Sequence, residues 1–104
     1  MQSEILNKLQ TKFQEIGGMI EKSMENSLLS CLDQNLNDPV KFATCSMKAT
    51  DDTEVVAKNL AIMNLYVSKR LEMAQDQNID INTISQELSD KLENPLNDLQ
   101  RRLN

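Results

Sequence analysis

The sequence predicts an all-α protein, an antiparallel helical hairpin with a short connecting helix plus a C-terminal helical extension. Apolar residues recur at spacings of three and four in three stretches, as they do on one face of a helix. Two Gly and two Pro in 104 residues leave few interruptions. The apolar side chains are mostly Leu, Ile, Val and six Met, with one Tyr and two Phe, which leaves little for a β-sandwich core. We assign residues 1–77 to the hairpin and residues 78–104 to the extension.

The first predicted helix runs from Ser3 to about Leu36. Ser3 is a suitable N-cap, and the acidic Glu4 follows it in the first turn. Gly17 and Gly18 interrupt the apolar stripe, and each lowers the stability of the helix by roughly 1 kcal/mol relative to Ala. We expect this pair to mark close packing by a neighbour or a mild bend. The stripe of this helix consists of Ile5, Leu9, Phe13, Ile16, Ile20, Met24, Leu28 and either Cys31 or Leu32.

The segment 35–39 is the first predicted break, because Asn37 or Asp38 can cap a helix and Pro39 fits the first helical position. A short helix over 40–48 carries Phe42 and Cys45. The segment 50–53 predicts a second break, since an Asp precedes a Glu by three residues there, as in a capping box. A second long helix then spans 54–76. Its stripe consists of Val56, Leu60, Met63, Val67 and Leu71.

Residues 76–80 are polar and are predicted to form a linker. Thr83 and Gln86 form another capping pattern, which begins the third helix. Pro95 lies inside the apolar pattern, which keeps its phase across the proline, so we expect either two short helices or one kinked helix. The stripe consists of Ile81, Ile84, Leu88, Leu92, Leu96, Leu99 and Leu103.

The composition excludes several classes of function. A net charge of −5 argues against nucleic-acid binding, which needs clustered Lys and Arg. Without histidine, the commonest general base and metal ligand is missing, and no glycine-rich phosphate loop is present. We therefore expect no catalytic residues, no metal and no cofactor. No run approaches the ~18 apolar residues of a membrane span, and the N-terminus has no cleavable-signal pattern. The expected partners are other proteins.

Cys31 and Cys45 flank the predicted turn at 35–39, with thirteen residues between them. Antiparallel helices on either side of this turn could bring their Cα atoms within bridging range. In the chain-entropy model, a bridge closing a loop of about 15 residues would raise the free energy of unfolding by roughly 3 kcal/mol. Two buried free thiols are the alternative, because Cys is among the most buried residue types.

The stretch 19–32 resembles the small TIM chaperones of the mitochondrial intermembrane space, which carry twin Cys-x3-Cys motifs. The Met, Lys and acidic positions of the family pattern correspond to Met19, Lys22 and Glu25. Ser27 occupies the outer cysteine position before the loop, and Cys31 the inner one. After the loop Cys45 matches the third cysteine, whereas Ala49 replaces the fourth, so one whole disulfide is missing and the other is kept. Residues 67–73 are similar to the basic and apolar run that ends the family's second helix.

This resemblance implies a Cys31–Cys45 disulfide and a hairpin that assembles with other helical subunits. It also implies apolar helix faces that shield hydrophobic membrane-protein precursors in the intermembrane space. The stripes themselves provide more apolar surface than one hairpin can bury, which agrees with a binding role. The predicted protein-binding residues are Phe13, Ile16, Ile20 and Met24 on the first helix, Met63, Val67 and Leu71 on the second, and Ile84, Leu88 and Leu99 on the third.

Two other interpretations remain open from the sequence. The chain could be a structural subunit of a larger mitochondrial membrane complex, associated with the membrane only through that complex. The third helix would then be its docking arm. The chain could also be a bacterial secretion-apparatus component or export chaperone, since such proteins are short, helical and dependent on partners.

Overall fold

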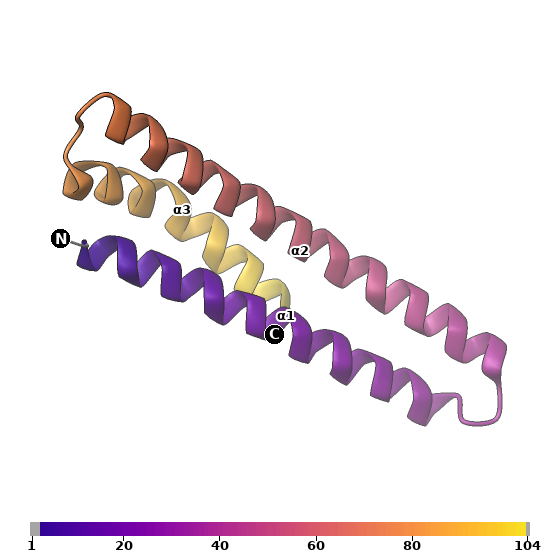
Figure 1. The fold of residues 1–104 in the computed structure, drawn as a ribbon. Helices are drawn as coiled ribbons and strands as arrows, with labels where there is room; N and C mark the ends of the chain where they lie inside the picture. Colours follow the sequence, from indigo (N-terminus) through magenta and orange to yellow (C-terminus); the bar gives the residue numbers. More distant parts are fainter. Residues whose placement is uncertain (1–2, 104) are drawn as a thin grey trace.

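The computed structural model describes residues 3–103 and contains three α-helices in this range, with no strand. They are α1 (Glu4–Gln34), α2 (Pro39–Asp76) and α3 (Ile81–Leu103). α1 and α2 form a long antiparallel hairpin, and α3 returns from the end of α2 to lie against both (Figure 1). The all-α prediction is confirmed. No helix in the described range is both long and apolar enough to cross a membrane.

The N-terminus of α1 and the turn between α1 and α2 form as the sequence predicts. The Ser3 Oγ accepts a hydrogen bond from the Leu6 amide at 3.4 Å and so caps α1. Asp38 caps α2 through a 3.1 Å bond from the Lys41 amide, and Pro39 occupies the first helical position. A proline is favourable there because its missing N–H would have had no partner within the helix.

The predicted break at residues 50–53 is wrong, and the short connecting helix does not exist as a separate element. α2 is continuous through this segment. The Thr50 and Thr53 hydroxyls donate to the carbonyl oxygens of Ser46 and Ala49, one turn earlier, at 2.8 and 2.9 Å. These side chains are therefore satisfied inside a helix, where the sequence pattern indicated a cap. Thr53 is also buried, which holds this turn of α2 against the rest of the molecule.

Two further local predictions are decided by the structure. Of the two alternatives at Pro95, it shows one helix, because α3 is continuous and contains Pro95. Gly17 and Gly18 are not sites of close packing, because a Cβ added at either residue would meet no atom within 4 Å. Both glycines have ordinary helical φ values, so neither is required by the backbone conformation.

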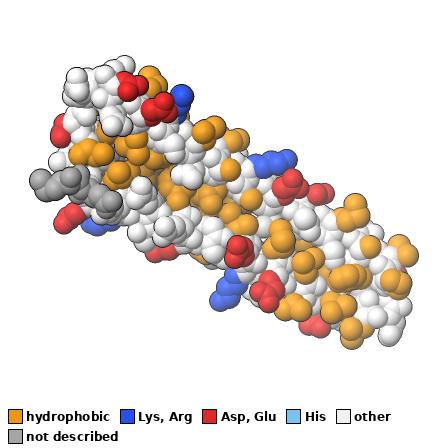
Figure 2. Space-filling model, in the orientation of Figure 1, with side chains coloured by type: hydrophobic (Ala, Val, Ile, Leu, Met, Phe, Trp, Pro, Cys, Tyr) orange, Lys and Arg blue, Asp and Glu red, His pale blue; other side chains and the backbone are white. Residues whose placement is uncertain are grey.

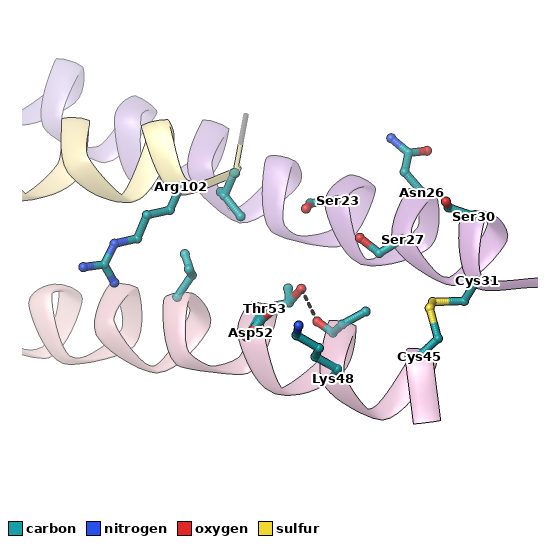
Figure 3. Close-up of a pocket in the computed structure, with 13 residues that line it drawn as sticks. Ser23, Asn26, Ser27, Ser30, Cys31, Cys45, Lys48, Asp52, Thr53 and Arg102 are labelled. Atoms are coloured by element: carbon teal, nitrogen blue, oxygen red, sulfur yellow. Dashed lines mark hydrogen bonds between the residues drawn. A yellow bond between two sulfur atoms is a disulfide. The ribbon is translucent and has the colours of Figure 1, made fainter. Parts of the chain in front are cut away.

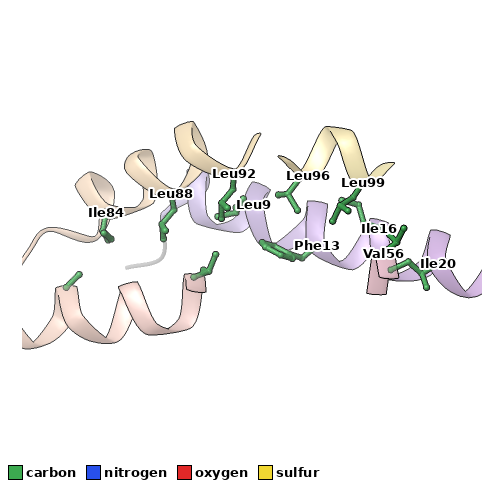
Figure 4. Close-up of a cluster of buried hydrophobic side chains, with 12 residues drawn as sticks. Leu9, Phe13, Ile16, Ile20, Val56, Ile84, Leu88, Leu92, Leu96 and Leu99 are labelled. Atoms are coloured by element: carbon green, nitrogen blue, oxygen red, sulfur yellow. The ribbon is translucent and has the colours of Figure 1, made fainter. Parts of the chain in front are cut away.

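One apolar core joins all three helices (Figure 4). The side chains of Ile16, Ile84, Leu88 and Leu96 are almost completely buried. Burying each such side chain stabilises the folded state by roughly 1.5–3 kcal/mol relative to leaving it in water. α3, the predicted C-terminal helical extension, thus shares its core with the hairpin. The buried members of the core are Leu9, Phe13, Ile16, Ile20, Val56, Val67, Ala74, Ile84, Leu88, Leu92, Leu96 and Leu99.

The length of α3 divides the molecule into two unlike ends. α3 has 23 residues, whereas α1 has 31 and α2 has 38. It lies along the N-terminal half of α1 and the C-terminal half of α2 (Figure 1). At 1.5 Å per residue, α3 covers about 35 Å of a molecule that is 61 Å long. The remaining two-helix end, residues 24–55, contains the turn between α1 and α2.

Candidate protein-binding site at the two-helix end

A covalent bridge joins the two helices near the turn. Cys31 of α1 and Cys45 of α2 are disulfide-bonded, with their Cα atoms 5.7 Å apart. This separation lies in the usual range for a disulfide. The Cys31 side chain is buried, and Cys45 is half-buried. The bridge fixes the spacing of α1 and α2 where no third helix packs between them.

A groove lies between α1 and α2, beyond the C-terminal end of α3 (Figure 3). It has a volume of about 600 Å³ and extends from Arg102 and Leu103 to the disulfide. Ser27 and Ala49, at the two positions where the family resemblance lacks cysteines, both line it. Most of its other side chains are small or polar. The groove is therefore a poor receptor for a strongly apolar ligand.

Large apolar side chains gather on the outside of the two-helix end. Figure 2 shows them around the tip of the molecule, where charged side chains are sparse. Leu36 and Val40 retain 70% and 74% of their surface, and α3 packs at the other end of the hairpin. Phe42 and Leu28 are half-buried in the same part of the hairpin. We call this surface the tip patch, and its exposed members are Leu29, Leu32, Leu36, Val40 and Met47.

The residues predicted to bind a partner lie elsewhere. Seven of them are buried in the core of the bundle, because α3 packs on the faces that were expected to be free. These seven are Phe13, Ile16, Ile20, Val67, Ile84, Leu88 and Leu99. The other three are half-buried: Met24, Met63 and Leu71. Apart from Met24, the predicted protein-binding residues lie in or against the intramolecular core.

The members of the tip patch were not predicted from the sequence. Leu29 and Val40 fall outside the apolar stripes, and Leu36 lies at the turn. Leu32 was only the alternative to Cys31 at the end of the first stripe. One sequence signal could have indicated them. The third apolar stripe spans fewer residues than the first predicted helix, so it is too short to cover the hairpin along its whole length.

An ion cluster connects α2 and α3 at the three-helix end. The Glu87 carboxylate accepts hydrogen bonds from Lys91 Nζ at 2.8 Å and from Arg70 Nη2 at 3.0 Å. The bond from Lys91, followed by the bond from Arg70, lowers the pKa of Glu87. The same contact raises the pKa of Lys91. This cluster helps to hold α3 in place and lies far from the tip patch.

Comparison with protein-family models, curated proteins and solved structures gives no match to this chain. Within residues 3–103, no group of three His, Cys, Asp or Glu side chains is arranged to hold a metal ion. The candidate site is the tip patch, a set of exposed apolar side chains on a cross-linked helical hairpin.

Proposed function

We propose that this chain is a non-enzymatic protein-interaction module whose two-helix end binds an apolar segment of another protein. The tip patch is the observation that carries this proposal. At the other end of the molecule, α3 covers the apolar faces of α1 and α2, whereas at the tip the corresponding side chains stay in water. Contiguous exposed apolar surface at one end of a small protein is typical of an interaction site.

The disulfide supports this proposal because it fixes the shape of the site. Cys31 and Cys45 hold the two helices together within a few turns of the exposed Leu36 and Val40. A preformed surface loses less conformational entropy on binding than two loosely paired helices would. The bridge also favours an oxidising compartment. With the resemblance to the small TIM chaperones, this favours the mitochondrial intermembrane space and apolar precursor segments as clients.

A second candidate is a structural subunit of a larger complex that binds one fixed helical partner. The burial of Phe13, Ile20 and Val67 favours it, because these side chains were expected to provide the broad apolar surface of a client-binding chaperone. Because these side chains are buried in the core, the exposed apolar surface is smaller. A smaller surface suits one defined partner better than many clients.

The test uses variants of the tip patch and a labelled peptide. Leu36→Ser combined with Val40→Ser removes apolar surface from exposed positions, so the fold should be retained. Ile62→Ser is a matched control, because Ile62 is also exposed and apolar but lies on α2 outside the tip patch. The probe is a fluorescent Leu/Ala-rich peptide of about 20 residues with lysines at both ends, the length of a membrane span.

Fluorescence anisotropy should show binding of this peptide by the wild-type chain and by the control, with at least a tenfold loss for the tip variant. If the wild type does not bind the peptide, but a single protein co-purifies with it and is lost from the tip variant, the fixed-subunit function is favoured. Equal binding by all three proteins would contradict a binding role for the tip patch.

A further inference from the structure

The Cys31–Cys45 bridge lies at the end of the groove between α1 and α2, and its two cysteines differ in exposure. Cys31 keeps only 3% of its surface in water, whereas Cys45 is half-buried. Both line the groove, which has a volume of about 600 Å³ (Figure 3). A disulfide is cut when a thiolate attacks one of its sulfurs, and the rate depends on access to that sulfur. The accessible side of this bridge is therefore Cys45.

The residues next to the bridge leave its groove side open. Ser27 of α1 and Ala49 of α2 each lie four residues, or one helical turn, from a bridge cysteine. Both line the groove, and both have small side chains. On the side of the turn, the positions about one helical turn away carry the larger Asn35 and Phe42, and Asn35 Nδ2 donates a 3.0 Å hydrogen bond to the Cys31 carbonyl oxygen. The groove is therefore the route by which a small molecule reaches the bridge.

The charge of the groove differs from that of the whole chain. Of the described residues that line it, Lys48 and Arg102 are positive and Asp52 is negative, which gives one net positive charge. The chain carries a net charge of −5. Lys48 follows Cys45 by three residues and lies on the groove side of α2 (Figure 3). A locally positive groove attracts anions, and its polar side chains suit a small, polar, anionic thiol.

We propose that the bridge is a thiol-exchange site at which a small anionic thiol of the glutathione class becomes attached to Cys45. The thiolate attacks Cys45 Sγ, and a new S–S bond forms as the bond between Cys45 and Cys31 breaks. Cys31 leaves as a thiolate and takes a proton from water. One disulfide replaces another, so the step needs no further oxidant or reductant. Attack by the Cys31 thiolate on Cys45 Sγ reverses the reaction, restores the bridge and releases the small thiol.

This exchange switches the two-helix end between two states. In the bridged state, the disulfide fixes α1 and α2 over residues 24–55, where α3 does not pack between them. In the Cys45 adduct, only non-covalent contacts hold the two helices together there. A high ratio of disulfide to thiol in the surroundings keeps the bridge closed, and a rise in thiol concentration opens it. The exchange takes place in the free chain, so the proposal does not depend on what the tip patch binds.

The first experiment identifies the sulfur that is attacked. The oxidised wild-type chain is mixed with excess glutathione for a short time, and acid stops the exchange by protonating the thiolates. Peptic digestion at low pH and mass spectrometry then locate the glutathione, which should be at least tenfold more abundant on Cys45 than on Cys31. In concentrated urea, where the groove is absent, we expect the two adducts to agree within about threefold.

The second experiment tests the groove as the route. Ala49→Phe places a ring in the groove one turn from Cys45 and should slow glutathione attachment at least tenfold. Ala43→Phe is the matched control, because Ala43 is exposed on α2 and does not line the groove. Lys48→Gln should lower the rate roughly twofold at low salt, as expected for one surface charge about a helical turn away. Lys41→Gln, at an exposed position outside the groove, should not lower it.

The third measurement tests the switch. In the Cys45 adduct, amides of residues 24–50 should exchange with deuterium faster than in the bridged chain, whereas those of residues 84–99 should not. The proposal is overturned if glutathione attaches mainly to Cys31 or equally to both cysteines of the folded chain. It is also overturned if the bridge reacts only after urea has unfolded the chain, or if Ala49→Phe and Ala43→Phe slow the reaction equally. Unchanged exchange in residues 24–50 of the adduct would show that the bridge controls no conformational state.

Discussion

Removal of the Cys31–Cys45 bridge is expected to loosen the two-helix end and to leave the three-helix end folded. The double variant Cys31→Ala and Cys45→Ala is the suitable perturbation, because Ala introduces no unpaired polar group at the buried position 31. The two ends should respond differently because different contacts stabilise them. The three-helix end keeps the core around Ile16 and Leu88, whereas the two-helix end relies on contacts between two helices.

The size of the effect follows from the loop that the bridge closes. The two cysteines are 14 positions apart in the sequence, and closing a loop of about this length contributes roughly 3 kcal/mol in the chain-entropy account. Because a factor of ten in an equilibrium corresponds to about 1.4 kcal/mol, the open form of the two-helix end should become roughly 100-fold more populated. Local opening of this kind is independent of global unfolding when the rest of the core remains intact.

Hydrogen–deuterium exchange measures this difference residue by residue. In the double variant, amides in residues 24–50 should exchange roughly 100-fold faster than in the oxidised wild type, as estimated above from the loop length. Amides in residues 6–20 and 84–99 should change little. The variant Ser27→Ala is the control, since it alters a groove residue beside the bridge without cutting it. An equal increase in exchange along all three helices would refute the reasoning, because it would mean that the two ends unfold as one unit.

Three further predictions concern the three-helix end. Leu88→Ala should lower the free energy of unfolding by about 2–5 kcal/mol, since it leaves a cavity at a fully buried position, as urea titration would show. Gly17→Ala and Gly18→Ala should each raise it by up to about 1 kcal/mol, because the space around both is open and Ala favours the helix. Glu87→Gln should make stability less dependent on pH in acid. The pKa of Glu87 is lowered in the folded chain by the hydrogen bond from Lys91, so its contribution is present above the ordinary value of 4.5 and is lost as the pH falls through the folded-state pKa.

Each of these predictions has a result that would contradict it. A loss well under 1 kcal/mol for Leu88→Ala would mean that α3 contributes little to the folded state, contrary to its share of the core. Lower melting temperatures for both alanine variants of the glycine pair would contradict the open space around Gly17 and Gly18. For Glu87, unfolding curves at several pH values should show the wild type more stable than the variant above about pH 5, and this difference should shrink as the pH falls through the folded-state pKa. Parallel curves over the whole range would assign the acid sensitivity to other carboxylates.

The local features that depend on a few neighbouring residues could be predicted from the sequence. Ser3 and Asp38 are capping residues, and both cap the helices that follow them. The fold class follows from the apolar periodicity in the same way. The segment 50–53 shows the limit of this reasoning. Its Asp and Thr residues are typical of a helix start, but the same Thr hydroxyls also bond to carbonyl oxygens inside a helix. Long-range packing of Thr53 and Val56 decides between the two outcomes, and the sequence pattern does not contain that information.

The candidate site could not be predicted for a related reason. An apolar stripe indicates that a helix face will be covered, but it does not indicate by which molecule. Phe13 and Val67 were therefore expected to contact a partner, and they contact α3 instead. The side chains that remain exposed, such as Leu36 and Val40, do not belong to a regular stripe. They are exposed because α3 packs against the other end of the hairpin, and that placement depends on the whole fold.

The unequal helix lengths explain how one small chain combines a stable core with an exposed apolar surface. A chain of 104 residues buries only a modest part of its apolar surface. Here that burial is concentrated where three helices meet, and a disulfide replaces the third helix at the other end. Among residues 3–103, α3 and the disulfide thus support opposite ends of the hairpin, and the bridge supports the surface that α3 leaves free.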